Sequence, residues 1–340
     1  MNQQYSIEEI KQLEITLSKN PTDTDLINKL AIGYSSCSEA ESFNQVDELL
    51  EKAYEINPTI KTSNNYAYQI ITDWYGYDLG IEILQPFVDK KPKSFMPYNL
   101  IGYAYLMKGS YEKAKSYFQE AMTLSQTEMV EIIHNLAVCE SHLGNPHKAI
   151  HLYERAIAIM DKENESKFNK ALCLVELGLD SDITKIIEEI KLSEAYKHPT
   201  AWVSCTDLSQ LCYLKNDMKQ AYDLLMESPF SFDLLSYPEF SYLLLKYNNS
   251  KYSKIEKKTI QEKESWLTRL NNIEDEEYED YSEEERTTEG KKLNSEIEAI
   301  KKLGQKLVNP PEIKPSELYK TISCGCMLYD CKIHGNQFDD

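Results

Sequence analysis

The sequence contains little glycine and proline: only 11 Gly and 12 Pro occur among 340 residues. Antiparallel β-sheets need both residues at their many tight turns, so this scarcity argues against a turn-rich all-β fold. Leu, Glu, Lys, Ala and Ile are frequent instead, and these residues favour helix. The length allows one large domain, two ordinary domains or an extended repeat array. We therefore expect an all-α protein.

Positive charge is also scarce, since 37 Lys and Arg stand against 56 Asp and Glu, for a net charge of −19. Nucleic acids and anionic membranes attract proteins through Lys and Arg, so this balance argues against both as partners. The natural electrostatic complement is a basic protein segment. We expect a basic protein partner whose association is fast and salt-sensitive.

Long apolar runs are missing, and no stretch approaches the 18 apolar residues that indicate a membrane span. The start, MNQQYSIEEIKQLEITL, has acidic residues where a secretory signal needs a basic region followed by an apolar run. Five of the eight cysteines lie scattered in helical patterns, which suits reduced, buried thiols: Cys37, Cys139, Cys173, Cys205 and Cys212. We expect a cytoplasmic protein.

The motifs of common enzymes are missing as well. The sequence has no Gly-rich nucleotide loop, no HExxH zinc motif and no strand–turn–helix nucleophile elbow. His147 and His151 are four residues apart on a predicted helix and can face one metal ion, but the pattern supplies no third ligand, which favours exposed histidines. We expect no catalysis, and a metal-dependent enzyme is the remaining alternative.

What the sequence does contain is a repeat with a period of 34 or 35 residues. Small residues recur where two antiparallel helices must approach closely, and a large aromatic residue recurs where neighbouring repeats leave space to fill. The pairs that are 35 residues apart are Gly109 and Gly144, Ala114 and Ala149, Phe118 and Tyr153, and Ala121 and Ala156.

Residues 95–126 show this pattern most clearly, with Gly102 on a first helix, Gly109 in the turn, and Tyr111, Ala114, Phe118 and Ala121 on a second helix. The pattern resembles the tetratricopeptide repeat family. The resemblance implies an all-α, right-handed solenoid of helical hairpins that binds other proteins and has no chemistry of its own. About six units are predicted, at 24–60, 61–94, 95–129, 130–163, 164–199 and 202–235.

Other segments flank the predicted array of residues 24–235. An N-terminal helix within residues 1–23 starts at the capping-box pair Ser6 and Glu9. Residues 236–308 are predicted to form capping helices, two of them long, near 252–272 and 282–307, with an acidic loop at 274–285 between them. Such a hairpin can cover the exposed end of a solenoid. A Pro-containing linker and a Cys/His-rich tail follow, over residues 309–340.

The first helix of each pair lines the concave surface of such a solenoid. The resemblance implies that asparagines there hydrogen-bond an extended peptide backbone, because a side-chain amide both donates and accepts. The alternative is that Asn is simply common in the first helices of this family and has no binding role. The register does not distinguish Asn64 from Asn65. The candidate partner-binding residues are Asn28, Asn65, Gln69, Asn99, Tyr103, Met107, Glu131, His134 and His142. Too few Lys and Arg occupy these positions for the family's carboxylate clamp.

The segment CGCMLYDCKIHG places four metal-ligand side chains within eleven positions: Cys324, Cys326, Cys331 and His334. Three cysteines and one histidine can form a closed tetrahedral zinc site that fastens the C-terminus without catalysing a reaction. The two cysteines of CGC can instead cycle between thiols and a disulfide. Free or packed thiols are the third alternative.

Two functions are compatible with these features. In the first, the chain is a protein-binding scaffold whose acidic groove holds a basic partner, as an immunity protein against a toxin or an effector chaperone does. In the second, it is a regulatory scaffold whose Cys/His tail senses metal or redox state.

Overall fold

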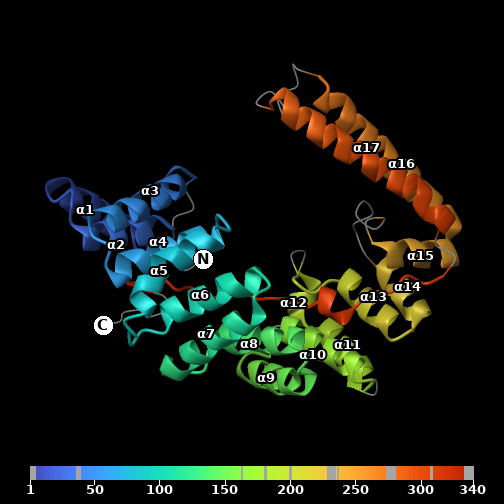
Figure 1. The fold of residues 1–340 in the computed structure, drawn as a ribbon, viewed down its shortest axis with the longest axis horizontal. Coiled ribbons are helices and arrows are strands. Elements are labelled where there is room, and N and C mark those ends of the chain that lie inside the picture. The colour runs from blue at the N-terminus through green and yellow to red at the C-terminus, as the bar shows by residue number, and fades with distance from the viewer. Residues whose placement is uncertain are drawn as a thin grey trace. The chain divides into compact units, whose positions relative to one another are not determined.

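The structure is a computed structural model that describes residues 5–35, 40–161, 164–179, 182–198, 201–227, 235, 237–272, 281–306 and 309–332. Every regular element in these residues is helical, which confirms the predicted all-α fold class (Figure 1). None of the helices in this described part is both long and apolar enough to span a bilayer. Cys37, His334 and most of the predicted acidic loop lie outside the described residues.

The chain folds as two compact units. The first comprises Met1–Cys173 together with Tyr319–Asp340, and the second comprises Leu174–Leu318. The predicted segment 309–340 is therefore divided at Tyr319, and its Cys-rich part belongs to the first unit although it follows the second in the sequence.

The first unit is a row of helical hairpins. Within it α2 packs on α3, α4 on α5, α6 on α7 and α8 on α9, and each hairpin packs on the next. The N-terminal helix α1 packs on α2 and begins at the predicted Ser6–Glu9 capping box. The helices are α1 Ile7–Lys19, α2 Thr24–Ser35, α3 Ala40–Ile56, α4 Ile60–Thr72, α5 Tyr77–Val88, α6 Met96–Met107, α7 Tyr111–Leu124, α8 Val130–His142, α9 Pro146–Ile159 and α10 Asn164–Glu176.

The hairpin of α6 and α7 shows why the repeat needs its small residues. A Cβ atom on Gly102 would lie 2.9 Å from the Cδ1 atom of Phe118, so only glycine permits this approach. Phe118 and its neighbours Ala114 and Ala121 are fully buried. Gly109 ends α6 with φ of +69°, a backbone conformation that other residues rarely adopt.

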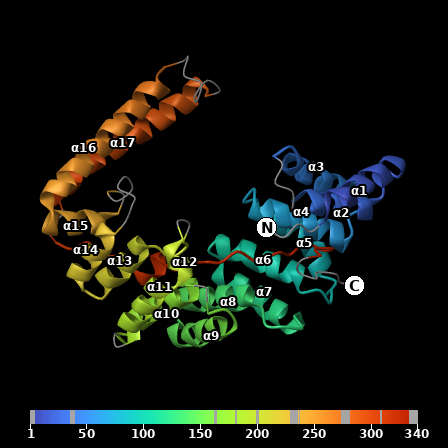
Figure 2. The ribbon, with the colours of Figure 1, turned by 180° about the vertical axis from the view of Figure 1, so that it is seen from behind.

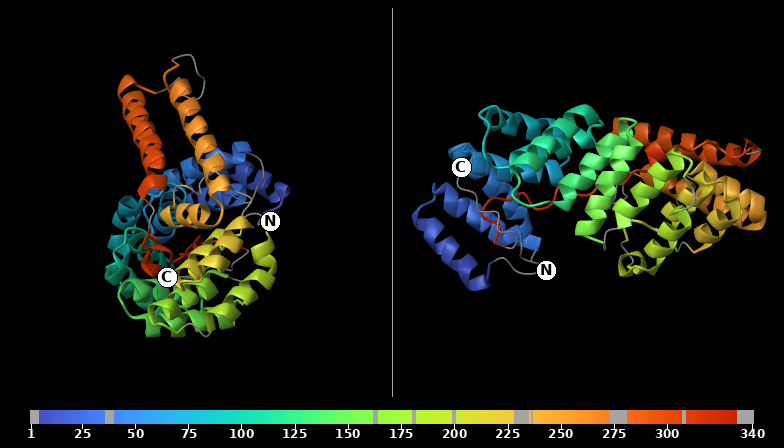
Figure 3. Two further views of the ribbon diagram at one scale, coloured as in Figure 1. Left: turned by 90° about the vertical axis from the view of Figure 1, so that its right-hand side faces the viewer. Right: turned by 90° about the horizontal axis from the view of Figure 1, so that it is seen from below.

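The second unit contains α11 Ile183–Leu192, α12 Glu194–Lys197, α13 Cys205–Leu214, α14 Met218–Met226, α15 Pro238–Tyr247, α16 Asn249–Leu270, α17 Glu283–Lys306 and the 3₁₀ turn η3 Pro315–Glu317. Helices α13 and α14 form a hairpin, α15 packs on α14, and α16 and α17 pack on each other and on α15. Figure 3 shows α16 and α17 as a long hairpin.

The seam between α16 and α17 is apolar. Leu270, Leu293, Ile297 and Ile300 are buried there, as their spacing predicts. Trp266 is 46% exposed, and the Lys263 ammonium lies 5.5 Å from the centre of its ring.

Candidate functional site

The C-terminal segment Tyr319–Lys332, which we call the tail, lies along the first helices of the first unit. It contacts α10, α8, α6 and α4 in turn, so it runs antiparallel to the order of the repeats. Figure 2 shows this segment in red, crossing the helices of the unit. The groove predicted to hold a partner peptide therefore contains a stretch of the chain itself.

Three asparagines each hold one residue of the tail by both of its backbone groups. Asn169 Nδ2 donates to the carbonyl of Lys320 at 2.7 Å, and the Lys320 N–H donates to Asn169 Oδ1 at 2.8 Å. Asn135 binds Ile322 in the same way, at 2.9 and 3.2 Å. Asn65 on α4 repeats the arrangement with Tyr329, at 3.3 and 2.8 Å.

Single hydrogen bonds supplement these pairs. Asn99 Nδ2 donates to the carbonyl of Cys324 at 2.9 Å, and Asn64 Nδ2 donates to that of Met327 at 2.6 Å. We call Asn64, Asn65, Asn99, Asn135 and Asn169 the asparagine ladder. All five are buried or nearly so, and a buried amide that is hydrogen-bonded in this way would be costly to leave unpaired.

The tail changes direction between the part held by Asn99 and the part held by Asn64. Gly325 has φ of +73° there, and a Cβ atom on it would lie 3.0 Å from Glu131 Oε1. Glycine is thus needed both for the backbone conformation and for the close approach to α8.

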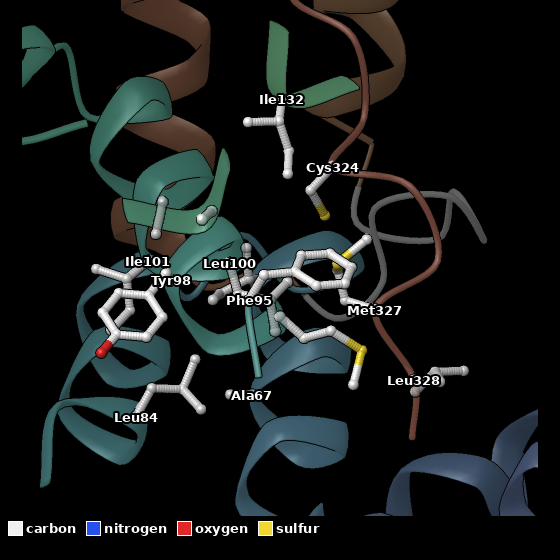
Figure 4. Close-up of a cluster of buried hydrophobic side chains, with 14 of the residues drawn as sticks. Ala67, Leu84, Phe95, Tyr98, Leu100, Ile101, Ile132, Cys324, Met327 and Leu328 are labelled. Atoms are coloured by element: carbon white, nitrogen blue, oxygen red, sulfur yellow. The ribbon is translucent and has the colours of Figure 1, made fainter. Parts of the chain in front are cut away.

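Side chains of the tail fill the apolar part of the groove. Cys324, Met327 and Cys331 are completely buried, and Tyr329 is 1% exposed. All four belong to the hydrophobic core of the first unit. Figure 4 shows Cys324, Met327 and Leu328 together with core side chains of the repeats, among them Ile132, Phe95 and Leu100. The tail is therefore packed as part of the core as well as hydrogen-bonded.

His134 on α8 joins the ladder through its imidazole. Its Nε2 lies 2.8 Å from the Lys320 carbonyl and its Nδ1 lies 2.8 Å from Ser166 Oγ. Complete burial lowers the pKa of His134 to about 4, so the ring is neutral at pH 7. These partners assign the proton to Nε2, which donates to the carbonyl, while Nδ1 accepts from the serine hydroxyl.

Ionic contacts lie at the far end of the tail. Lys61 Nζ is 3.0 Å from Asp330, and Lys332 Nζ is 2.9 Å from Glu9 and 3.7 Å from the centre of the Tyr5 ring. The Lys332–Glu9 pair is exposed, and exposed ion pairs contribute little to stability, whereas the Lys61–Asp330 pair is partly buried.

Most of the predicted partner-binding residues lie next to the tail. Besides Asn65, Asn99, His134 and Glu131, the sulfur of Met107 accepts a long hydrogen bond from Thr321 at 4.0 Å. The ring of His142 stacks on Tyr111 and meets the edge of Tyr319. Tyr103 packs against the core cluster that includes the tail, and burial, with a smaller effect of Cys324, raises its pKa to about 12.

Two predicted residues behave differently. Gln69 donates to Asp73, the C-cap residue of α4, at 2.6 Å. Asn28 on α2 is fully buried, and its amide atoms have no hydrogen-bond partner among the residues that the structure describes. That these nine residues bind a separate partner stays a prediction, because the contacts seen are with the chain's own tail.

Asn135 and Asn169 were missed because the ladder uses two neighbouring helix positions. Asn65, Asn135 and Asn169 each lie two residues before a packing alanine, namely Ala67, Ala137 and Ala171. Asn64, Asn99 and His134 lie three residues before a packing residue, which is Ala67, Gly102 and Ala137 respectively. The predicted spacing follows the second position, on which His134 and Phe168 lie. Three asparagines at the first position were the available signal.

The metal prediction is not tested by these contacts. Among the described residues, no three His, Cys, Asp or Glu side chains form a group that could hold a metal ion. His334 lies outside those residues, so a zinc site at the tail stays a prediction. His147 and His151 are both exposed on α9, as expected from their pattern.

Comparison with known families identifies the repeat. The sequence model of the tetratricopeptide repeat family matches residues 93–162, which include α6 to α9. This stretch of the chain therefore carries tetratricopeptide repeats, and no subfamily is assigned. No curated protein gave a significant match.

Solved structures with a similar fold are distant in sequence. The tetratricopeptide protein YrrB, described as having an unusual peptide-binding site, is 17% identical with a TM-score of 0.43, over 52% of this chain and 93% of its own. MamA is 20% identical with a TM-score of 0.43, over 51% and 92%. PilF of Pseudomonas aeruginosa is 15% identical with a TM-score of 0.47, over 71% and 99%.

Proposed function

We propose that this chain is a non-enzymatic protein-interaction scaffold whose groove takes an extended segment of a partner. The observation that carries the proposal is the asparagine ladder, which holds the backbone of the tail at Lys320, Ile322 and Tyr329 through paired hydrogen bonds. Backbone groups are common to every extended segment, so the same amides can hold another chain.

The tail is then a built-in competitor for this groove. It is covalently attached, so its local concentration exceeds that of any free segment, and a partner must displace it to bind. The buried positions of Cys324, Met327 and Tyr329 indicate what a displacing segment must supply: small or apolar side chains at matching positions. The groove is closed until such a segment arrives.

The partner that we propose is a basic protein, and the scaffold acts on it in the cytoplasm. The net charge of −19 supports this choice, because a basic segment gains from the surrounding negative potential. An immunity protein against a toxin and an effector chaperone are the two roles that such a partner suggests.

A labelled peptide with the sequence of residues 318–332 tests the proposal. The variant Met327→Asp with Tyr329→Asp places charges in the core and should release the tail from the full-length chain. We expect this variant to bind the peptide at least roughly tenfold more tightly than the wild-type chain does, because the competing segment has gone. Equally weak binding to both chains would contradict the proposal.

Ladder variants provide the specificity control. In the tail-released background, Asn135→Ala and Asn169→Ala should weaken peptide binding, whereas Asn294→Ala should not. Asn294 is an exposed asparagine on α17 whose side chain donates to the local carbonyl of Gly290. Capture of a basic protein by the tail-released chain, lost at high salt and lost in the ladder variants, would support the proposed partner.

A further inference from the structure

Two thiols of the tail lie side by side in the docked conformation. The side chains of Cys326 and Cys331 are in hydrogen-bond contact. A tight turn brings them together: the Cys331 N–H donates to the Leu328 carbonyl at 3.4 Å, and Asp330 has φ of +66°. The backbone of Leu328 also hydrogen-bonds the sulfur of Cys326, which fixes that side chain within the turn.

The two thiols differ in their access to solvent. Cys326 is only partly buried and lines a cavity of about 230 Å³ together with Tyr68, Gln69 and Asp73. Cys331 is completely buried and does not line this cavity. A small reagent that enters the cavity therefore reaches Cys326 first and finds Cys331 as the neighbouring thiol.

The third cysteine of the tail is placed differently. Cys324 is fully buried, its carbonyl is held by Asn99, and its thiol donates to the Gly325 carbonyl at 3.6 Å. It does not line the cavity that Cys326 lines. The spacing C-G-C alone suggests a Cys324–Cys326 pair, but the turn brings Cys331 to Cys326 instead.

We propose that Cys326 and Cys331 form a reversible disulfide that fastens the tail in the groove. The oxidant is a low-molecular-weight disulfide such as oxidised glutathione. The Cys326 thiolate attacks one sulfur of this disulfide, forming a mixed disulfide and expelling one thiolate. The Cys331 thiolate then attacks the Cys326 sulfur and expels the second thiolate. Two protein thiols are oxidised and one small disulfide is reduced to two thiols.

The disulfide closes a ring over residues 326–331 in the conformation that the docked tail already has. The released tail then has fewer conformations available, so docking loses less entropy and displacement becomes harder. This consequence rests on the proposed function, whereas formation of the disulfide does not.

The first test identifies the linkage. The reduced full-length chain is incubated with oxidised glutathione, alkylated and analysed by peptide mass spectrometry. We expect a Cys326–Cys331 cross-link that dithiothreitol removes. Cys331→Ser should instead retain glutathione on Cys326, and Cys324→Ser should leave the cross-link intact. A Cys324–Cys326 cross-link, or a stable mixed disulfide in the wild-type chain, would overturn the proposal.

The second test measures the effect on the groove. The probe is the labelled 318–332 peptide with its three cysteines replaced by serine. Oxidised wild-type chain should bind it at least roughly tenfold more weakly than reduced chain, as a six-residue ring predicts, with recovery after reduction. Equal binding in both states would overturn the fastening role.

The double variant Cys326→Ser with Cys331→Ser separates the two proposals. It should bind the peptide with no dependence on redox state. If the double variant behaves in this way, but the oxidised wild-type chain binds the peptide as tightly as the variant does, the proposed fastening by the disulfide is wrong and the groove proposal stands. If no chain binds the peptide even after release of its tail, the groove proposal itself is wrong.

Discussion

At the scale of single residues, the asparagines of the first helices determine which backbone groups of the tail are held. An Asn side chain matches the donor and acceptor of one residue in an extended segment, so each paired contact is independent of the side chain at that residue. Asn65, Asn135 and Asn169 all use this geometry, on three different repeats. The recurrence across repeats makes a continuous recognition surface from a single residue type.

Replacing Asn135 by Ala should loosen the tail. The change leaves the N–H and carbonyl of Ile322 without partners, which we expect to lower the free energy of tail release by about 2 kcal/mol. Hydrogen-exchange mass spectrometry of the segment 319–332 measures the effect as faster exchange. Asn294→Ala is the matched control, and equal exchange in the two variants would show that Asn135 does not hold the tail.

His134 should make the stability of the first unit depend on pH. Burial lowers its pKa to about 4 from an ordinary value of 6.5, so between these values the unfolded chain binds a proton that the folded chain does not. The free energy of unfolding should therefore fall by about 2 kcal/mol from pH 7 to pH 5 and stay level above pH 7.

Urea unfolding of the wild-type chain and of His134→Gln at the two pH values checks this expectation. The variant should lose most of the pH dependence and keep a smaller part from His142, whose pKa burial also lowers. An unchanged difference between pH 7 and pH 5 in the variant would assign the effect to other groups.

At the scale of helices, the packing residues of the repeat could be predicted and the register of the groove could not. The predicted units 61–94, 95–129 and 130–163 enclose, to within a residue, α4 with α5, α6 with α7, and α8 with α9. Their small and aromatic residues repeat because the space between helices repeats. The groove asparagines occupy two adjacent positions, and a shift of one residue turns a side chain by about 100° around a helix, so a regular spacing led to Phe168 instead of Asn169.

Gly102 should be intolerant of even a methyl group. Alanine there would place Cβ 2.9 Å from the Phe118 ring, and we expect overpacking to destabilise the first unit by about 1–3 kcal/mol. Gly290→Ala on α17 is the contrasting change, because its Cβ would meet Leu267 at an ordinary 3.6 Å. Helix propensity should make that variant more stable by about 0.5–1 kcal/mol. Thermal unfolding measures both, and equal effects would contradict the packing argument.

At the scale of the whole molecule, the last described segment of the chain, the tail, belongs to the first unit although it follows the second unit in the sequence. Asn65 and Tyr329 are 264 residues apart, and no pattern in CGCMLYDC indicates that its backbone will be held by amides so far away. The contacts run from asparagine side chains of the repeats to the backbone of the tail, so they constrain the sequence of the repeats and leave that of the tail free. The fold class could therefore be predicted from the repeat, whereas the segment that occupies the groove could not.

Release of the tail should expose the groove without unfolding the array. Met327→Asp with Tyr329→Asp should speed hydrogen exchange throughout 319–332 and at the groove helices α4 and α6, while the hairpin of α16 and α17, in the other unit, keeps its protection. Circular dichroism should show nearly unchanged helix content. Loss of most helical signal would mean that the tail is an indispensable part of the core and not a displaceable occupant.

Residue-resolved amide exchange of the tail by nuclear magnetic resonance tests the central claim most directly. The amides of Lys320, Ile322 and Tyr329 donate to asparagines of the ladder, whereas those of Thr321 and Ser323 have no acceptor among the described residues. We predict slow exchange at the first three and fast exchange at the other two. Uniformly fast exchange across 319–332, at the rate of the free peptide, would contradict the account.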